Sequence, residues 1–317
     1  MREPRARPGM TDLRPEPRIS VLIPAFERAR ELRLCLEGFR NQTLAAEAFE
    51  VIVVDDGSSS DLAPVASSVA GLRLEFRRSE HAGPSVARNI ALSVARAPLL
   101  LLYDDDIQPL PGLLEYCLEF HHRHPENSAA ALLYFTQDLS VTPFPFEEWA
   151  FARLYPFPSS AGIYPWPYFW SGSVTCKRSL LADCTFNPRY RSIEDAELAF
   201  RLSQRGPLAV HFEPHPGGLL LRRLNFDEVC RRQRQMAYYR FRMAADCNGI
   251  QYPHRVYAHP EEYLVRDPAL LQTAKALASR SGVGVSPLAS ALWTMAENHA
   301  IATGWLAAQR GVPPEAL

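Results

Sequence analysis

The strongest constraint on the fold is a repeated alternation of apolar segments and amphipathic helical patterns between residues 19 and 121. The segments predicted as strands cover residues 19–23, 51–54, 72–76 and 99–102. Apolar residues at helical spacing follow the first of them, at Leu32, Cys35, Leu36 and Phe39. Buried strands separated by amphipathic helices are typical of a mostly parallel sheet that helices cover on both faces. The sequence therefore predicts an α/β fold.

Three polar clusters follow strands of this predicted sheet, at residues 24–27, 55–58 and 104–106. In sheets of this kind, ligands bind beyond the carboxyl ends of the strands. We therefore expect the three clusters to converge on one binding site.

The third cluster consists of three consecutive carboxylates, Asp104, Asp105 and Asp106. Two carboxylates separated by one residue on a tight turn can point at one cation, and Mg²⁺ and Mn²⁺ prefer hard oxygen ligands that they share with substrate phosphates. A cation held there would neutralise a diphosphate leaving group as a Lewis acid. The alternative is a solvated turn, although three adjacent carboxylates repel one another when no cation is near.

Other candidate residues occur where strands end or helices begin. Asp56 precedes Gly57, which allows a sharp turn, and its carboxylate can accept from a nucleobase or a ribose, or simply stabilise the turn. Arg88 lies in the first turn of a predicted helix, which suits either a phosphate or a surface ion pair. Glu194 and Asp195 begin another helix, where Asp195 either interacts with the helix dipole or acts as a general base on an acceptor hydroxyl.

After about residue 140 the pattern changes. Residues 143–170 are rich in Pro and aromatic residues, and Trp166 and Trp170 either stack on the sugar rings of an acceptor or pack in the core. From about residue 226 the chain reads as mainly helical. The Arg-rich stretch at 231–242 either meets an anionic acceptor or a membrane surface, or is a solvated helix face.

Composition excludes several classes of protein. The 34 basic and 35 acidic residues leave a formal charge of −1, which does not support bulk binding of nucleic acid. No apolar run approaches the length of a bilayer span, and the Arg- and Pro-rich first 17 residues lack the apolar region of a secretory signal. The six cysteines show no CxxC spacing, which predicts free thiols in a reducing compartment. We expect a cytoplasmic protein, with a peripheral contact at the inner membrane face as an alternative.

Together the motifs resemble those of family 2 glycosyltransferases, in the same order and over about residues 18–222. The segments that carry the resemblance are residues 19–26, 42–43, 51–58, 83–89, 104–106, 170–173 and 194–202. The resemblance implies a GT-A fold, a nucleotide-sugar donor that is commonly UDP-linked, and transfer of a hexosyl-type group with inversion of the anomeric configuration.

The resemblance also implies roles for individual residues. Those implied to line the nucleotide site are Pro24, Phe26, Glu27, Asp56 and Arg88. Asp104 and Asp106 would bridge Mn²⁺ or Mg²⁺ and the diphosphate, Asp105 would touch the donor sugar, and Asp195 matches the base of the family. The candidates for acceptor contacts are Trp166, Trp170 and Glu194.

These roles agree with the chemistry of inversion. One in-line displacement needs one base beside the acceptor and a metal that holds the leaving diphosphate, whereas glycoside hydrolysis needs paired carboxylates. The chain departs from the family in one respect, since many relatives carry a His after the base helix that completes the metal site. No position in residues 211–223 matches it clearly, and Arg222 or Arg223 is the alternative contact for the diphosphate.

We therefore predict a disordered tail (1–17), a GT-A catalytic domain (18–225) and a helical C-terminal extension (226–317). The predicted partners are a nucleotide-sugar donor and a glycan, glycolipid or small-molecule acceptor, as in polysaccharide biosynthesis. Three alternatives stay open: a retaining transferase or nucleotidyltransferase on the same fold, an inactive GT-A module that binds a glycan or protein partner, and a membrane-tethered polymerase. The first strand is not followed by a phosphate loop with Gly and Lys, which argues against a nucleotidyltransferase.

Overall fold

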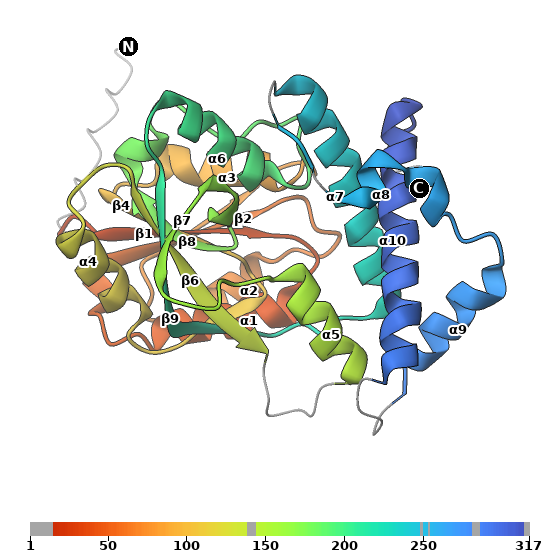
Figure 1. Cartoon of the computed structure of the whole chain (residues 1–317). Coiled ribbons are helices and arrows are strands. Elements are labelled where there is room, and N and C mark those ends of the chain that lie inside the picture. The colour runs from red at the N-terminus through yellow and green to blue at the C-terminus, as the bar shows by residue number, and fades with distance from the viewer. Residues whose placement is uncertain (1–14, 138–143, 248–249, 253, 281–285, 314–317) are drawn as a thin grey trace, which may run out of the picture.

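The structure is a computed structural model that describes residues 15–137, 144–247, 250–252, 254–280 and 286–313 (Figure 1). Most of the predicted N-terminal tail, residues 1–14, therefore lies outside the described residues, as does residue 143 of the aromatic block. Among the described residues, no helix is both long enough and apolar enough to cross a membrane.

A mixed sheet forms the centre of the fold, with strand order β3-β2-β1-β4-β8-β6-β9-β5 and with β7 paired to β9. The strands are β1 Ile19–Ala25, β2 Phe49–Asp55, β3 Leu74–Arg78, β4 Leu99–Tyr103, β5 Ile107–Pro109, β6 Ala129–Gln137, β7 Gly162–Tyr164, β8 Ser173–Lys177 and β9 Ala209–Leu220. The four strands β1 to β4 pair in parallel, whereas β8 runs antiparallel to both β4 and β6. The predicted mostly parallel sheet is confirmed for the N-terminal half.

Helices cover both faces of this sheet, as the sequence predicts (Figure 1). The α-helices are α1 Ala29–Arg40, α2 Ala63–Ser68, α3 Pro84–Val94, α4 Leu113–Arg123, α5 Pro145–Leu154, α6 Glu194–Arg205, α7 Phe226–Asp246, α8 Arg255–Ala258, α9 Pro268–Ala278 and α10 Pro287–Gln309. Successive side chains of a strand point to opposite faces, so Val21 packs with α1 and α4 while Leu22 packs with α3 and α6. Both strand residues are fully buried.

The C-terminal helices pack against one another and against the sheet domain. Helices α7 and α10 lie side by side in Figure 1, and Gly304 of α10 lets the backbone of α7 at Arg234 come close. Between them the Gln233 side-chain amide donates to Glu297 over 2.8 Å in a buried position. Trp293 of α10 is buried in the same apolar cluster as α1 and α4, so the extension shares a core with the sheet domain.

Candidate active site

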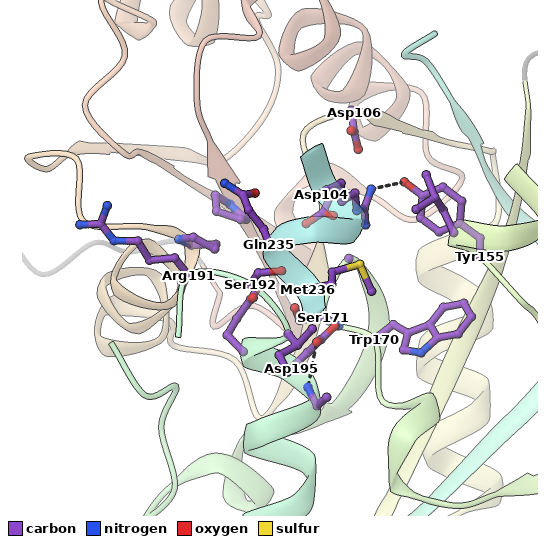
Figure 2. A pocket seen from close by; sticks show the side chains of 18 of the residues that line it. Asp104, Asp106, Tyr155, Trp170, Ser171, Arg191, Ser192, Asp195, Gln235 and Met236 are labelled. Atoms are coloured by element: carbon purple, nitrogen blue, oxygen red, sulfur yellow. Dashed lines mark hydrogen bonds between the residues drawn. The ribbon is translucent and has the colours of Figure 1, made fainter. Parts of the chain in front are cut away.

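A cavity of about 680 Å³ lies at the carboxyl ends of β1 and β4 and is closed on its other side by α7 (Figure 2). Its lining includes every residue that the sequence places in the donor, metal, base and acceptor sites except Glu27. These lining residues are Pro24, Phe26, Asp56, Arg88, Asp104, Asp105, Asp106, Trp166, Trp170, Glu194 and Asp195. The predicted convergence of the polar clusters is therefore observed.

The acidic triplet sits on the turn that follows β4. Asp105 and Asp106 are buried, with 1 % and 4 % of their surface exposed, whereas the Asp104 side chain is 37 % exposed and faces the cavity. The backbone N–H of Asp104 donates to the carbonyl of Gly172 over 3.0 Å. A Cβ added at Gly172 would lie 2.6 Å from Oδ2 of Asp104, so glycine is needed there for the carboxylate to keep its place.

Three arginines neutralise the triplet. Arg28 donates to Asp105 over 2.8 Å and lies 3.5 Å from Asp106. Arg222 comes within 3.2 Å of Asp106, and Arg88 donates to Asp104 over 2.7 Å. Burial, together with the like charges of Asp106 and Asp104, raises the pKa of Asp105 to about 7 in spite of Arg28. Extra positive charge beside the triplet would therefore stabilise its ionised form.

The donor atoms of the triplet fit a divalent metal ion. They are carboxylate oxygens, the ligands that Mg²⁺ and Mn²⁺ prefer, and both Asp104 and Asp106 line the cavity. Arg222 lies beside Asp106, while Arg223 turns away and donates to Glu147 over 2.5 Å. Of the two arginines suggested as diphosphate contacts, Arg222 is the one that lines the cavity.

Arg88 links the triplet to the start of α6. Its guanidinium donates to Glu194 over 2.6 Å as well as to Asp104, and only 4 % of its side chain is exposed. The buried Arg88 therefore joins two walls of the cavity through two ion pairs. Its carboxylate partners are both residues of the predicted site. Burial raises the pKa of Glu194.

Asp195 is held by backbone donors at both of its carboxylate oxygens. Its Oδ2 accepts from the N–H of Ser171 over 3.1 Å, and its Oδ1 accepts from the N–H of Ala196 over 2.8 Å. Ile193 precedes the helix at φ 55°, an unfavourable conformation for a β-branched residue that sets the direction of the α6 start. Burial raises the pKa of Asp195, which makes it a stronger proton acceptor than an exposed aspartate.

The side of the cavity at β1 and β2 carries an aromatic pair. Phe26 is 39 % exposed and stacks on His81, with ring centroids 4.4 Å apart. Asp56 accepts from the backbone N–H groups of Ala82 and Gly83 at 2.9 Å, and it lies 3.0 Å from Nδ1 of His81. Both carboxylate oxygens of Asp56 are therefore already engaged in holding the 81–83 turn.

Glu27 is the predicted nucleotide-site residue that the structure places apart from the cavity lining. It has φ 57°, and its carboxylate accepts from the N–H of Ser59 over 2.6 Å and from the Ser59 hydroxyl over 2.9 Å. Its own N–H donates to Ser58 over 2.8 Å. The observed role of Glu27 is to tie the loop after β1 to the loop after β2.

Trp166 and Trp170 line the cavity but also pack against the protein. Trp166 meets Phe200 of α6 edge-on, with centroids 5.6 Å apart, and Trp170 packs on Phe157 at 5.0 Å. The Trp170 ring N–H donates to the carbonyl of Pro167 over 2.8 Å. The packing that the sequence offers as one alternative is therefore observed, and both rings also line the cavity, where stacking on an acceptor stays a prediction.

One wall of the cavity was not predicted from the sequence. Helix α7 lines it with residues at helical spacing, namely Glu228, Arg231, Arg232, Gln235, Met236 and Arg240. The opposite face of α7 buries Val229, Gln233 and Ala237. The sequence predicts that this Arg-rich stretch meets an anionic acceptor or a membrane surface, or is a solvated face. Its four-residue spacing against a buried face is the signal that could have located the wall. Arg28 and Arg222 were also missed as partners of the triplet.

Comparison with known proteins identifies the family of the chain. The family model described as glycosyl transferase family 2 matches residues 20–183. The chain belongs to glycosyl transferase family 2. Validoxylamine A glucosyltransferase of Streptomyces hygroscopicus subsp. jinggangensis is 37 % identical over 108 residues, which are 33 % of this chain and 26 % of that protein. The putative glycosyltransferase EpsH of Bacillus subtilis is 30 % identical over 105 residues, 32 % of this chain and 28 % of that protein.

Solved structures resemble this family 2 chain over nearly its whole length. Residues 1–349 of S. aureus TarS, crystallised in complex with UDP, superpose with a TM-score of 0.52 at 17 % identity, covering 93 % of this chain and 92 % of that one. The mannosyltransferase PcManGT of Pyrobaculum calidifontis, in complex with GDP-Man and Mn²⁺, gives a TM-score of 0.59 at 17 % identity, covering 94 % and 88 %. The predicted GT-A fold is confirmed, whereas the two curated relatives above are matched over only about a quarter of their length.

Proposed function

We propose that this chain transfers a hexosyl-type group from a nucleotide-sugar donor, UDP-linked, to an acceptor hydroxyl with inversion and with the help of a divalent metal ion. The observation that carries the proposal is the arrangement of one cavity with the acidic triplet in one wall and the backbone-held Asp195 in another (Figure 2). The family assignment and the complexes of the two structural neighbours support the donor class.

The donor would lie between β1 and the triplet. The exposed face of the Phe26–His81 pair offers a surface on which a nucleobase can stack, and Pro24 flanks it. Asp104 and Asp106 would hold the metal ion, Mn²⁺ or Mg²⁺, which supplies Lewis-acid stabilisation of the charge on the leaving diphosphate. Arg28 and Arg222 pair with the buried Asp105 and Asp106 and hold these carboxylates in place.

The acceptor would enter beside α6. Asp195 takes the proton of the attacking hydroxyl, and its raised pKa suits that role. Glu194 is bonded to Arg88 and is therefore the less available of the two carboxylates. A single base on the acceptor side is the arrangement that one inverting displacement requires.

The C-terminal helices complete the site. We propose that residues 18–225 form the catalytic domain and that residues 226–317 are an extension whose helix α7 closes the acceptor side of the cavity. Arg231, Arg232 and Arg240 on that face would meet anionic parts of the substrates. The acceptor is a glycan, a glycolipid or a small molecule, and the place of action is the cytoplasm, with a peripheral membrane contact when the acceptor is lipid-linked.

The test is a thermal-shift panel of UDP, GDP, dTDP and CDP, each with Mn²⁺ and with EDTA. A nucleotide at a hundredfold excess over its Kd stabilises the folded state by about 2.7 kcal/mol. We expect a shift with UDP that needs Mn²⁺ and that is lost in the Asp104→Asn/Asp106→Asn variant. The matched control, Asp183→Asn, changes an exposed aspartate outside the cavity and should keep the shift. No shift with any nucleotide on folded protein would favour an inactive module instead.

A further inference from the structure

A second group of metal-ligating side chains lies far from the cavity. His124 caps the C-terminal end of α4, Glu126 lies in the turn before β6, and His211 is in β9 opposite Ala131 of β6. Their ligand atoms all lie within 4.8 Å of one another. We call these three residues the α4–β9 cluster. They have no role in the proposed transfer reaction.

The side chains of the cluster are already in mutual contact. Nδ1 of His124 lies 3.4 Å from Oε1 of Glu126, and the ring centroids of His124 and His211 are 4.2 Å apart. The side chains of His124 and Glu126 are 27 % and 47 % exposed, so an ion can reach the cluster from solvent.

One ring nitrogen of the cluster is available to bind an ion. Nε2 of His211 is buried and has no hydrogen-bond partner among the residues that the structure describes. Buried polar atoms are nearly always bonded, so such a nitrogen needs an explanation, and coordination to a metal ion would provide one. Phe120 packs against both rings, at 4.7 Å from His124 and 5.2 Å from His211, and shields this side of the cluster from water.

Lys177 and two glutamates surround the cluster. The turn is held from behind by Lys177, whose Nζ donates to the carbonyls of His124 over 2.9 Å and of Glu126 over 2.7 Å. The positive charge of Lys177 disfavours a cation at the cluster, whereas the negative charges of Glu126 and the nearby Glu213 favour one.

We propose that His124, Glu126 and His211 bind a Zn²⁺ ion that ties the end of α4 to β9. Two imidazole nitrogens and one carboxylate are ligands that Zn²⁺ accepts, with water in the fourth tetrahedral position. The all-oxygen triplet suits Mg²⁺ or Mn²⁺ instead, so ligand chemistry separates the two metals. The sites are also distant. His211 and Leu220 lie nine residues apart in β9, which is about 30 Å of strand, and Leu220 pairs with Ile107 beside the triplet.

The role of such an ion follows from where the ligands lie. His124 and Glu126 bracket the turn between α4 and β6, and His211 belongs to the strand beside β6. An ion bound to all three would fix the α4 end against the sheet without touching the cavity. We therefore expect Zn²⁺ to change stability and to leave nucleotide binding unchanged.

The experiment is calorimetric titration of EDTA-stripped protein with Zn²⁺ alone, in the Asp104→Asn/Asp106→Asn background so that the triplet does not contribute. One site is expected, and His211→Gln and His124→Gln should each weaken it by at least about tenfold. The matched control, His122→Gln, alters an exposed histidine on the same helix and should bind as the parent does. Glu126→Gln should also weaken Zn²⁺ binding. Because Glu126 is exposed, this variant should fold even if the histidine variants do not.

Two further measurements complete the test. Zn²⁺ should raise the melting temperature of the parent but not of His211→Gln, and Co²⁺ in place of Zn²⁺ should give the visible absorption of a tetrahedral site. Absence of Zn²⁺ binding at micromolar concentration in the folded parent would overturn the proposal. Equal affinity in the parent and in the His211→Gln, His124→Gln and Glu126→Gln variants would overturn it as well.

Discussion

The two buried ion pairs of Arg88 predict how much stability the protein loses when this side chain is replaced. Arg88→Met keeps the length of the side chain but removes the charge that Asp104 and Glu194 share over 2.7 and 2.6 Å. Removing one partner of a buried ion pair costs about 3–5 kcal/mol. Asp104 can be rehydrated because its side chain is 37 % exposed, whereas Glu194 at 10 % cannot, so we expect the lower limit, about 3 kcal/mol.

Urea unfolding at pH 8 and pH 6 measures this loss. Burial already raises the pKa of Glu194, and without Arg88 it should rise further, so the loss should be smaller at pH 6, where more of Glu194 is protonated. Glu194→Gln added to Arg88→Met should restore most of the stability because the uncompensated charge is gone. Arg30→Met serves as the exposed control, with an expected change within about 0.5 kcal/mol.

A loss below about 1 kcal/mol for Arg88→Met at pH 8 would refute the reasoning, since it would mean that the buried carboxylates do not depend on Arg88. Failure of Glu194→Gln to restore stability would refute it in another way. In that case the cost would come from packing, for example against Phe186, whose ring lies 5.6 Å from the guanidinium carbon.

Three other changes probe the same cavity. Gly172→Ala should displace the Asp104 carboxylate and lower transfer activity by about 10²-fold while the melting curve stays close to that of wild type; full activity would show that the close approach is dispensable. Asp105→Asn removes a group whose pKa is raised from 3.8 to about 7, so the stabilisation from its protonated form is present at low pH and lost as the pH rises through 7. Between pH 5 and 7, the free energy of unfolding of the variant should therefore rise relative to that of wild type by up to about 1.4 kcal/mol per pH unit, measured by urea unfolding without metal. A difference in free energy that does not change with pH would contradict this. Asp195→Asn should lower kcat by about 10²–10⁴-fold and leave UDP binding unchanged in calorimetry; a comparable kcat would assign the base elsewhere.

Local patterns explain why the cavity could be largely predicted. The apolar runs at 19–23 and 51–54 can be stable only as strands buried on both faces, and parallel pairing places the residues after them at one edge. Asp56, Asp104 and Asp106 follow such strands, so their convergence in one cavity needs no knowledge of distant contacts.

Contacts between distant segments could not be predicted in this way. Glu27 was expected in the nucleotide site on the strength of its position after β1, but the left-handed backbone at this residue turns its carboxylate to Ser59. The antiparallel insertion of β8 between β4 and β6 is likewise invisible in the sequence, because the pattern of a buried strand does not reveal its direction. It is β8 that brings Gly172 against Asp104.

The α/β class, the family motifs and the candidate side chains of the site could all be predicted from local patterns, because periodicity and the ends of strands are local properties of the chain. Which charges meet depends instead on how distant segments pack. Arg28, Arg88 and Arg222 come from three separate segments to neutralise one triplet, and α7 becomes a wall of the cavity because its other face is buried against α10. Ion pairs and helix packing join residues far apart in the chain, and their partners are set by how the elements pack rather than by any spacing along the sequence.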